Sequence, residues 1–255
     1  MGAEKWPDPG GACIMGWMFR SLALAAVATV LVTAPAHAAS PGDRKVVKLS
    51  NEETRTLWAH PGSTALIRHS PSLKSHGFKR LHLMTEDGFP EVYIALATTR
   101  DANGVQWIQI RVPMRPNGRK GWVPRDALGR FHTVHTHLIV DRHKLRATLF
   151  YGKRLIWSSP VGVGKPSTPT PGGRFYIRER IRALQNNTIY GPYAFGTSDY
   201  STLSEWPGGG IVGIHGTNEP NLIPGRPSHG CIRLPNNKVT QLWRRLPVGT
   251  PLHVI

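Results

Sequence analysis

The amino-acid sequence predicts a mainly β protein with one or two short helices. Glycine (27 residues) and proline (22 residues) are frequent in this chain of 255 residues, which favours turns and short strands over long helices. Several short segments alternate apolar and polar residues, as half-buried strands do. Residues 236–246 are the one good helix candidate, because their apolar residues recur at helical spacing.

Residues 1–38 are predicted to be a secretory signal peptide. Arg20 precedes an apolar run at 22–33, and residues 36–38 (AHA) have the small-x-small pattern of a cleavage site. A membrane anchor is the alternative, but the run is shorter than the ~20 residues that a spanning helix needs. Met15 and Met18 are alternative start sites. We therefore expect a secreted protein of the periplasm or cell wall, with no stable membrane span after cleavage.

The charge balance predicts an anionic partner. The chain has 32 Lys and Arg against 15 Asp and Glu, a formal net charge of +17. Removing residues 1–38 removes two positive and two negative residues, so the mature chain keeps this charge. Outside the membrane, the polymers of the cell envelope are the anionic partners to expect. The basic residues are scattered rather than gathered in a block, which argues against nucleic acid.

The first half of the mature chain is predicted to be a linker followed by a small β-barrel. Residues 39–53 are polar and read as the linker, and residues 54–130 contain about five short β segments. Asn103-Gly104 and Asn117-Gly118 are typical of hairpin turns between them.

The second half, residues 131–255, is predicted to be a separate β domain. Alternating strands run from about residue 136 to 177, and a last strand ends the chain. Residues 186–210 are polar and rich in turn formers, so we expect a lid or wall of a cleft rather than a regular element. Tyr190 and Trp206 in this stretch are candidates for ligand contact, with burial in the core as the alternative. Asn236 or Asn237 is expected to cap the helix.

The stretch GIHGTNEPNLIPGRPSHGCIRL, residues 213–234, carries the candidate chemistry. Cys231 is the only cysteine after the signal peptide, and an unpaired thiol in an exported protein is incidental, paired with another molecule, or reactive. His215 follows an apolar run and is expected at the end of a buried strand, from which the loop folds back to Cys231. Gly230 allows close backbone approach and N–H groups aimed at an oxyanion.

Two other interpretations fit this stretch less well. His215, His229 and Cys231 are three potential zinc ligands, but their spacing is not that of a structural zinc site and no second cysteine is present. A purely structural polar loop is the other alternative. Ser228 is a poor candidate nucleophile, because it lacks a G-x-S-x-G context. We expect no metal and no cofactor.

The paired motifs resemble a known family. IHGTNEP (214–220) followed by SHGCIRL (228–234) is similar to the signature of the L,D-transpeptidases, the YkuD-type catalytic domain. The hairpin at 137–152 and the segment TPGGRF (170–175) extend the resemblance over about 133–255. Residues 66–72, 107–110 and 121–123 resemble the pieces of a bacterial SH3-like domain. The resemblance implies a YkuD-type β-sandwich preceded by a small SH3-like β-barrel.

The same resemblance implies roles for individual residues. Cys231 would be the nucleophile and His215 the general base and acid, oriented by the backbone carbonyl of Gly216. The Gly230 N–H would stabilise the oxyanion. The expected supporting or substrate-binding residues are His229, Ser228, Arg233, Thr217 and Tyr190.

The implied substrate is the peptide stem of peptidoglycan. Cys231 would form an acyl-enzyme and pass the acyl group to a neighbouring stem, which gives a 3→3 cross-link. Carbapenem β-lactams would acylate the same thiol. Transfer to water instead would make the protein an L,D-carboxypeptidase, and an inactive site would leave a non-catalytic wall-binding protein. The SH3-like region is expected to bind a wall polymer, or else to be an accessory domain without a ligand.

Overall fold

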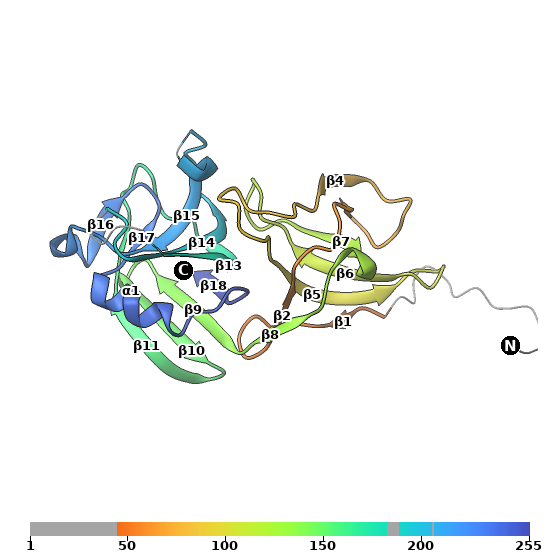
Figure 1. The fold of residues 1–255 in the computed structure, drawn as a ribbon, viewed down its shortest axis with the longest axis horizontal. Helices are drawn as coiled ribbons and strands as arrows, with labels where there is room; N and C mark the ends of the chain where they lie inside the picture. Colours follow the sequence, from red (N-terminus) through yellow and green to blue (C-terminus); the bar gives the residue numbers. More distant parts are fainter. Residues whose placement is uncertain (1–44, 183–188, 206) are drawn as a thin grey trace, which may run out of the picture. The chain divides into compact units, whose positions relative to one another are not determined.

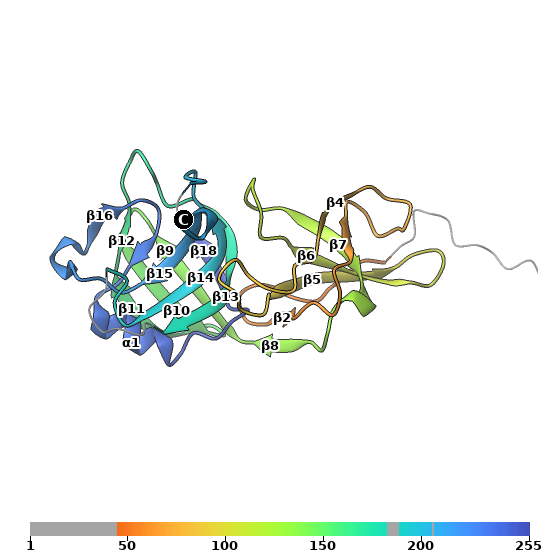
Figure 2. The same ribbon diagram turned by 45° about the horizontal axis from the view of Figure 1, so that its top comes forward.

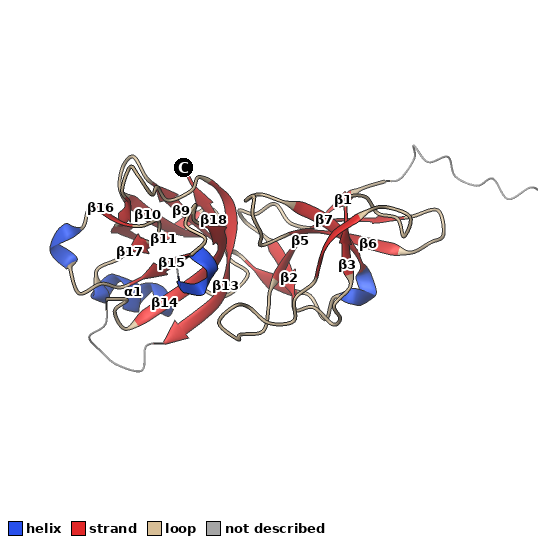
Figure 3. Cartoon of the chain, turned by 90° about the horizontal axis from the view of Figure 1, so that it is seen from above, coloured by secondary structure: helices blue, strands red, loops and turns tan. Residues whose placement is uncertain are grey.

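The computed structural model describes residues 45–182, 189–205 and 207–255. The predicted signal peptide and Trp206 lie outside these residues. Strands dominate the described chain, as the sequence predicts (Figure 3). None of the helices in the described ranges is long and apolar enough to cross a membrane.

The first sheet is eight-stranded and is built from residues 47–134. Its strands follow the order β4-β3-β7-β6-β5-β2-β8, with β1 paired to β5 (Figure 1). The strands are β1 (Val47–Lys48), β2 (Thr56–Ala59), β3 (Leu66–Arg68), β4 (Gly77–Arg80), β5 (Tyr93–Arg100), β6 (Gln106–Arg111), β7 (Lys120–Pro124) and β8 (His132–Val134), with a 3₁₀ turn η1 at Arg125–Ala127.

Both predicted hairpin turns are present in this sheet. Strands β5 and β6 pair antiparallel, as do β6 and β7. The glycine of each turn has a positive φ, 78° at Gly104 and 85° at Gly118, a conformation that glycine adopts without the steric cost of a Cβ. Part of the expected linker belongs to the sheet, since β1 lies within it and Ser50 is buried. Closure into a barrel, and with it the SH3-like resemblance, stays a prediction.

The second sheet is ten-stranded, with the order β11-β10-β9-β18-β13-β14-β15-β17-β12-β16. Apolar side chains from β9 to β11 and from β13 to β15 share one buried core, so the sheet folds over into two layers (Figures 1 and 2). The strands are β9 (Thr136–Asp141), β10 (Arg146–Tyr151), β11 (Arg154–Pro160), β12 (Gly162–Gly164), β13 (Gly173–Arg182), β14 (Tyr193–Tyr200), β15 (Ile211–His215), β16 (Gly225–Ser228), β17 (Ile232–Arg233) and β18 (Pro251–Val254), with 3₁₀ turns η2 (Pro207–Gly210) and η3 (Pro220–Leu222).

Strand β14 corrects the prediction for residues 186–210. This stretch was expected to lack regular structure, yet it supplies an eight-residue strand between β13 and β15. The polar residues of β14 are buried rather than solvent-facing, so the strand lacks the alternation of apolar and polar residues that predicts a strand. Thr197 Oγ1 donates to the Val212 carbonyl at 2.7 Å, and Ser198 Oγ accepts from the Tyr176 N–H at 3.1 Å.

Helix α1 (Asn236–Trp243) confirms the one helix that the periodicity predicts. Val239 and Leu242 are buried on its inner face, with Trp243 packed against the same core. The expected cap is wrong. The N-cap residue is Pro235, and no side chain caps the helix. The Asn236 side-chain oxygen accepts from the Thr217 N–H instead.

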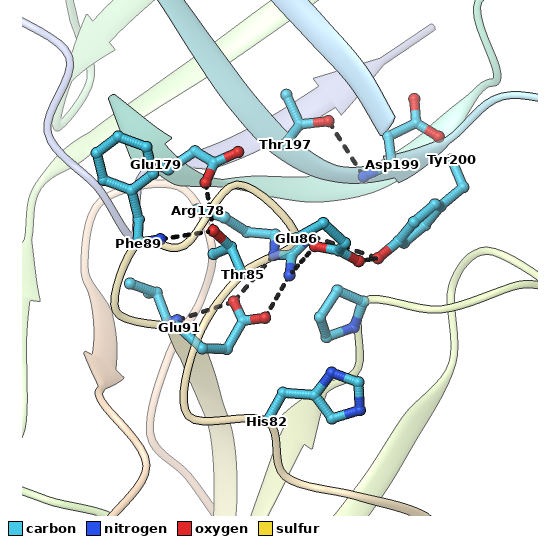
Figure 4. A network of polar contacts seen from close by, with 12 residues as sticks. His82, Thr85, Glu86, Phe89, Glu91, Arg178, Glu179, Thr197, Asp199 and Tyr200 are labelled. Atoms are coloured by element: carbon cyan, nitrogen blue, oxygen red, sulfur yellow. Dashed lines mark hydrogen bonds and ion pairs between the residues drawn. The ribbon is translucent and has the colours of Figure 1, made fainter. Parts of the chain in front are cut away.

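A buried polar network joins the two sheets, which lie in one compact unit, residues 39–255. Arg178 of β13 forms ion pairs with Glu91, and with Glu86 at 2.9 Å, both from the β4–β5 connection (Figure 4). Tyr200 of β14 donates its hydroxyl to Glu86 at 2.5 Å, and Thr85 donates to Glu179 at 2.6 Å. Burial alone would lower the pKa of Arg178, but its pairing with Glu91 raises that pKa above the ordinary value.

Candidate active site

The pairing of β15 with β17 brings the two halves of the motif together. The strands are parallel, with Ile214 opposite Ile232 and His215 opposite Arg233. Cys231 directly precedes β17, so its side chain lies beside β15. His215 is the last residue of β15, as expected, and is 4% exposed.

The imidazole of His215 has a defined tautomer. Its Nδ1 lies 2.6 Å from the carbonyl oxygen of Gly216. A carbonyl oxygen only accepts, so Nδ1 carries the proton and Nε2 keeps its lone pair. Tyr190 packs edge-to-face on the ring, with centroids 5.0 Å apart at 76°. The arrangement leaves a neutral imidazole whose basic nitrogen is Nε2.

The thiol of Cys231 lies next to this ring. Its Sγ accepts a hydrogen bond from the Gly213 N–H at 3.4 Å. A Cβ placed on Gly213 would lie 3.8 Å from His215 Cδ2, the atom bonded to Nε2, and 3.9 Å from Cys231 Sγ. The thiol and the basic edge of the imidazole therefore border the same space. They line one cleft with Tyr190, Ser201, His229 and Arg233.

Electrostatics keep both groups uncharged at neutral pH. Burial lowers the pKa of His215 to about 4, and the charge of Arg233 adds to this effect against the Gly216 hydrogen bond. Burial raises the pKa of Cys231 above its ordinary value of 9.0, although the Gly213 N–H and Arg233 act in the opposite direction. The resting pair is thus a thiol beside a neutral base, rather than a thiolate–imidazolium ion pair.

This resting state predicts a pH titration. We expect the thiolate ultraviolet absorbance of Cys231 to be absent at pH 7 and to titrate with a midpoint above pH 9, because the pKa of Cys231 lies above the ordinary 9.0. The measurement is the difference spectrum between wild type and Cys231→Ala at each pH, which cancels the contribution of Cys13. A thiolate signal that persists to pH 5 in that difference would contradict a neutral pair.

The turn around Gly230 is held by side-chain hydroxyls. Ser228 Oγ donates to the Cys231 carbonyl at 2.6 Å and accepts from the Gly230 N–H at 3.1 Å. Thr170 Oγ1 donates to the Gly230 carbonyl at 2.7 Å. Gly230 itself has φ +125°, a conformation that disfavours a side chain. Ser228 is 1% exposed, lines the cleft, and uses its hydroxyl to support this turn.

Gly230 differs from expectation in one respect. Its N–H was expected to point at an oxyanion, but it donates to Ser228 Oγ within the turn. The two-residue spacing between Ser228 and Gly230 allows this local hydrogen bond to form. Thr170 was not singled out as a site residue, although it opens the TPGGRF segment that carried part of the resemblance.

Thr217 also supports the backbone. It is 1% exposed, its N–H donates to Asn236 Oδ1 at 2.9 Å, and its Oγ1 accepts from the Glu219 N–H at 3.0 Å. A Cβ on Gly216 would lie 2.3 Å from the same Asn236 oxygen, so the carbonyl-bearing turn packs directly on this side chain. Asn236 is therefore a further supporting residue that sequence reasoning took for a helix cap.

Basic residues lie at the rim of the cleft. Arg233 Nη1 pairs with Glu219 at 2.9 Å, and its side chain is 19% exposed. Lys165 Nζ donates to His229 Nε2 at 3.0 Å, and His229 is exposed. Tyr190 is 42% exposed while contacting His215. Of the expected supporting residues, Tyr190, Ser228, His229 and Arg233 line the cleft, whereas Thr217 supports the backbone next to His215.

Buried Asp199 of β14 is a titratable group that the sequence did not identify. It is 0% exposed, and burial raises its pKa to about 8. Asn117 Nδ2 donates to Asp199 Oδ1 at 2.7 Å. The electrostatic effect of Asp199 raises the pKa of Cys231. Within the described ranges, no group of three or more His, Cys, Asp or Glu side chains is arranged to hold a metal ion.

Comparisons with known proteins find similarity over the part of the chain that contains the site. Residues 135–254 match the family profile of the YkuD L,D-transpeptidase catalytic domain. The chain is 35% identical to YkuD of Bacillus subtilis over 119 residues, covering 47% of this chain and 65% of that protein. It is 34% identical to YkuD of Bacillus licheniformis over 122 residues, covering 48% of this chain and 67% of that protein. The chain spans about two thirds of the length of these relatives.

More distant similarities extend to other bacteria. L,D-transpeptidase 1 of Mycobacterium tuberculosis is 26% identical over 180 residues, which cover 58% of this chain and 70% of that protein. Among solved structures, the catalytic domain of an Enterococcus faecium L,D-transpeptidase is 25% identical, with a TM-score of 0.36, and the match covers 47% of this chain and 96% of that one.

Proposed function

Since this chain belongs to the YkuD family of L,D-transpeptidase catalytic domains, we propose that it is an exported cysteine transpeptidase that forms 3→3 cross-links in peptidoglycan. One observation carries the proposal. The Nδ1 of His215 is bound to the Gly216 carbonyl, so Nε2 is the basic nitrogen beside the lone thiol of Cys231. An oriented base next to a thiol is one of the arrangements that activate a nucleophile for covalent catalysis.

The acylation half-reaction follows from a neutral pair. His215 Nε2 takes the proton of the Cys231 thiol as sulfur attacks the carbonyl carbon at the L-centre of the third stem residue. The Cys231 N–H, expected together with that of Gly230 to face the oxyanion, would stabilise its charge, because the Gly230 N–H donates to Ser228 Oγ. The tetrahedral intermediate collapses, the C–N bond breaks, and Nε2 returns the proton to the departing D-alanine amine.

Transfer to the acceptor reverses these roles. The side-chain amine of a neighbouring stem attacks the thioester carbonyl and gives a proton to His215 Nε2. The carbon–sulfur bond breaks, and Cys231 regains its proton. Arg233 and Lys165 place positive charge at the rim, which suits the carboxylates of a stem peptide. The aromatic face of exposed Tyr190 offers a contact for the stem next to His215.

The setting of the enzyme rests on the sequence. Export relies on the signal-peptide pattern of residues 1–38, and the formal net charge of +17 suits an anionic wall. We propose that residues 131–255 are the catalytic domain and that residues 54–130, with the SH3-like resemblance, contact a wall polymer. No cofactor enters the proposed reaction.

Product analysis tests the proposal. Purified protein is incubated with disaccharide-tetrapeptide and an isotopically labelled acceptor stem, and the products are separated and identified by mass spectrometry. We expect labelled 3→3 dimer together with free D-alanine. D-alanine release without labelled dimer would identify a carboxypeptidase. Binding to peptidoglycan sacculi without either product would identify a wall-binding protein and overturn the proposal.

A further inference from the structure

The β6–β7 hairpin of the first sheet reaches the cleft in the second sheet. Its connecting segment, residues 112–119, carries Arg115. The Arg115 guanidinium donates to the Ser201 carbonyl from Nε at 3.2 Å and from Nη2 at 2.9 Å, and to the Gly209 carbonyl at 3.0 Å. It also lies over the Tyr200 ring, 4.8 Å from the centroid. One side chain thus contacts both Ser201, which follows β14, and Gly209 of η2.

Asn117 makes a second set of contacts from the same hairpin. Its amide donates to Asp199 Oδ1 at 2.7 Å and to the Tyr200 carbonyl at 2.8 Å, and its oxygen accepts from the Tyr200 N–H at 3.1 Å. Asn117 thus makes to the Tyr200 backbone the same pair of hydrogen bonds that a neighbouring strand would make at the end of β14. Asn117 therefore fixes the backbone from which Ser201 follows.

Ser201 and Gly210 form one wall of the active-site cleft. Ser201 and Gly210 line the cleft with Cys231, and the Ser201 N–H donates to the Gly210 carbonyl at 2.8 Å. A Cβ on Gly230 would lie 3.4 Å from the Ser201 Cβ, so Ser201 packs against the turn that carries the thiol. A Cβ on Gly210 would lie 2.5 Å from Arg115 Nη2, which shows how closely the guanidinium approaches this wall.

We infer that Arg115 and Asn117 are positioning residues for catalysis: the first sheet completes the cleft by holding the wall formed by Ser201 and Gly210 against the Cys231 turn. The inference rests on the proposed function and deepens it, since it gives the N-terminal sheet a role in acyl-donor binding. A peptide stem lies across the wall as well as against the thiol, whereas a small alkylating reagent needs only the thiol and its base. Misplacement of a wall by about 1 Å is enough to slow a positioned reaction by ~100-fold.

The experiment compares Arg115→Ala and Asn117→Ala with Arg119→Ala. Arg119 is an exposed arginine of the same hairpin with no side-chain contact among the described residues, so it controls for the loss of charge. The readouts are kcat and KM with a tetrapeptide donor, and the rate of Cys231 alkylation by iodoacetamide. For Arg115→Ala and Asn117→Ala we expect kcat/KM to fall ~10–100-fold. Alkylation of Arg115→Ala should stay within about twofold of wild type. Arg115→Lys should restore part of the loss, because an ammonium donates to one carbonyl at a time.

Amide hydrogen exchange gives a readout that needs no enzymatic activity. Exchange at the Ser201 N–H should be faster in Arg115→Ala than in Arg119→Ala. Only Arg115→Ala removes the hydrogen bonds to the Ser201 and Gly209 carbonyls that hold this backbone. Unchanged exchange, or a kcat/KM within about twofold of Arg119→Ala, would overturn the positioning role. A wild-type protein that never acylates would instead refute the proposed function, and the exchange result would still decide whether Arg115 holds the wall.

Discussion

Cys231→Ala is expected to form neither cross-linked product nor a carbapenem adduct while keeping the thermal stability of the wild type. The thiol is the nucleophile of the proposed reaction, and Cys231 is the one free cysteine among the described residues. Loss of a covalent nucleophile costs about 10⁶-fold in kcat in a comparable hydrolytic site. A methyl group fits where the thiol lies, so the fold should be undisturbed. Mass spectrometry of intact and digested protein measures the adduct, and thermal unfolding measures the fold.

The chain offers a matched control for this experiment. Cys13 is the other cysteine of the sequence, so Cys13→Ala removes a thiol of the same kind from the predicted signal peptide. Full activity and a carbapenem adduct on Cys231 are expected in this variant. An adduct on another residue, or cross-linking that survives Cys231→Ala, would exclude the cysteine mechanism and leave the family membership intact.

Arg178→Met is expected to lower the free energy of unfolding by about 3–5 kcal/mol, since it leaves Glu91 buried without its counter-charge. Both side chains are almost fully buried, 2% exposed for Arg178 and 1% for Glu91. Arg178 also pairs with Glu86 from the first sheet (Figure 4). The loss corresponds to a decrease in Tm of about 10 °C for a domain of this size. Chemical denaturation and calorimetry would measure it.

The double variant Arg178→Met/Glu91→Gln separates an ion pair from simple packing. Removing both charges should recover part of the lost stability, because the stranded carboxylate is the main cost of the single change. Arg182→Ala, an exposed arginine of the same strand, should change stability by less than about 0.5 kcal/mol. A single variant as stable as wild type would show that this network does not hold the sheets together.

Local sequence signals predicted the features whose cause is local. The two Asn-Gly turns, the strand that ends at His215 and the helix at α1 each follow from a short pattern of turn formers or apolar spacing. The role of Asn236 was mistaken for the same reason. A residue at a helix start is a common cap, and only the folded chain brings the Thr217 N–H to its side chain.

Strand β14 shows where such signals fail. Alternation identifies a strand when one face is apolar and the other solvated. Thr197, Ser198 and Asp199 are buried polar residues whose partners are Val212, Tyr176 and Asn117, all distant in sequence. Their polarity therefore indicated a loop. The sequence also gave no sign that Asp199 influences the pKa of the Cys231 thiol.

The sequence by itself determined the candidate chemistry of this protein: a lone thiol, a histidine after an apolar strand, and a motif similar to that of a known family. Tertiary structure decided the state and the surroundings of that chemistry. Burial sets the protonation of His215 and Cys231, and parallel pairing of β15 with β17 sets their proximity. Arg115 and Asn117 reach the cleft wall from residues more than 80 positions away. Burial and long-range contact depend on how the whole chain packs, so no short stretch of sequence encodes them.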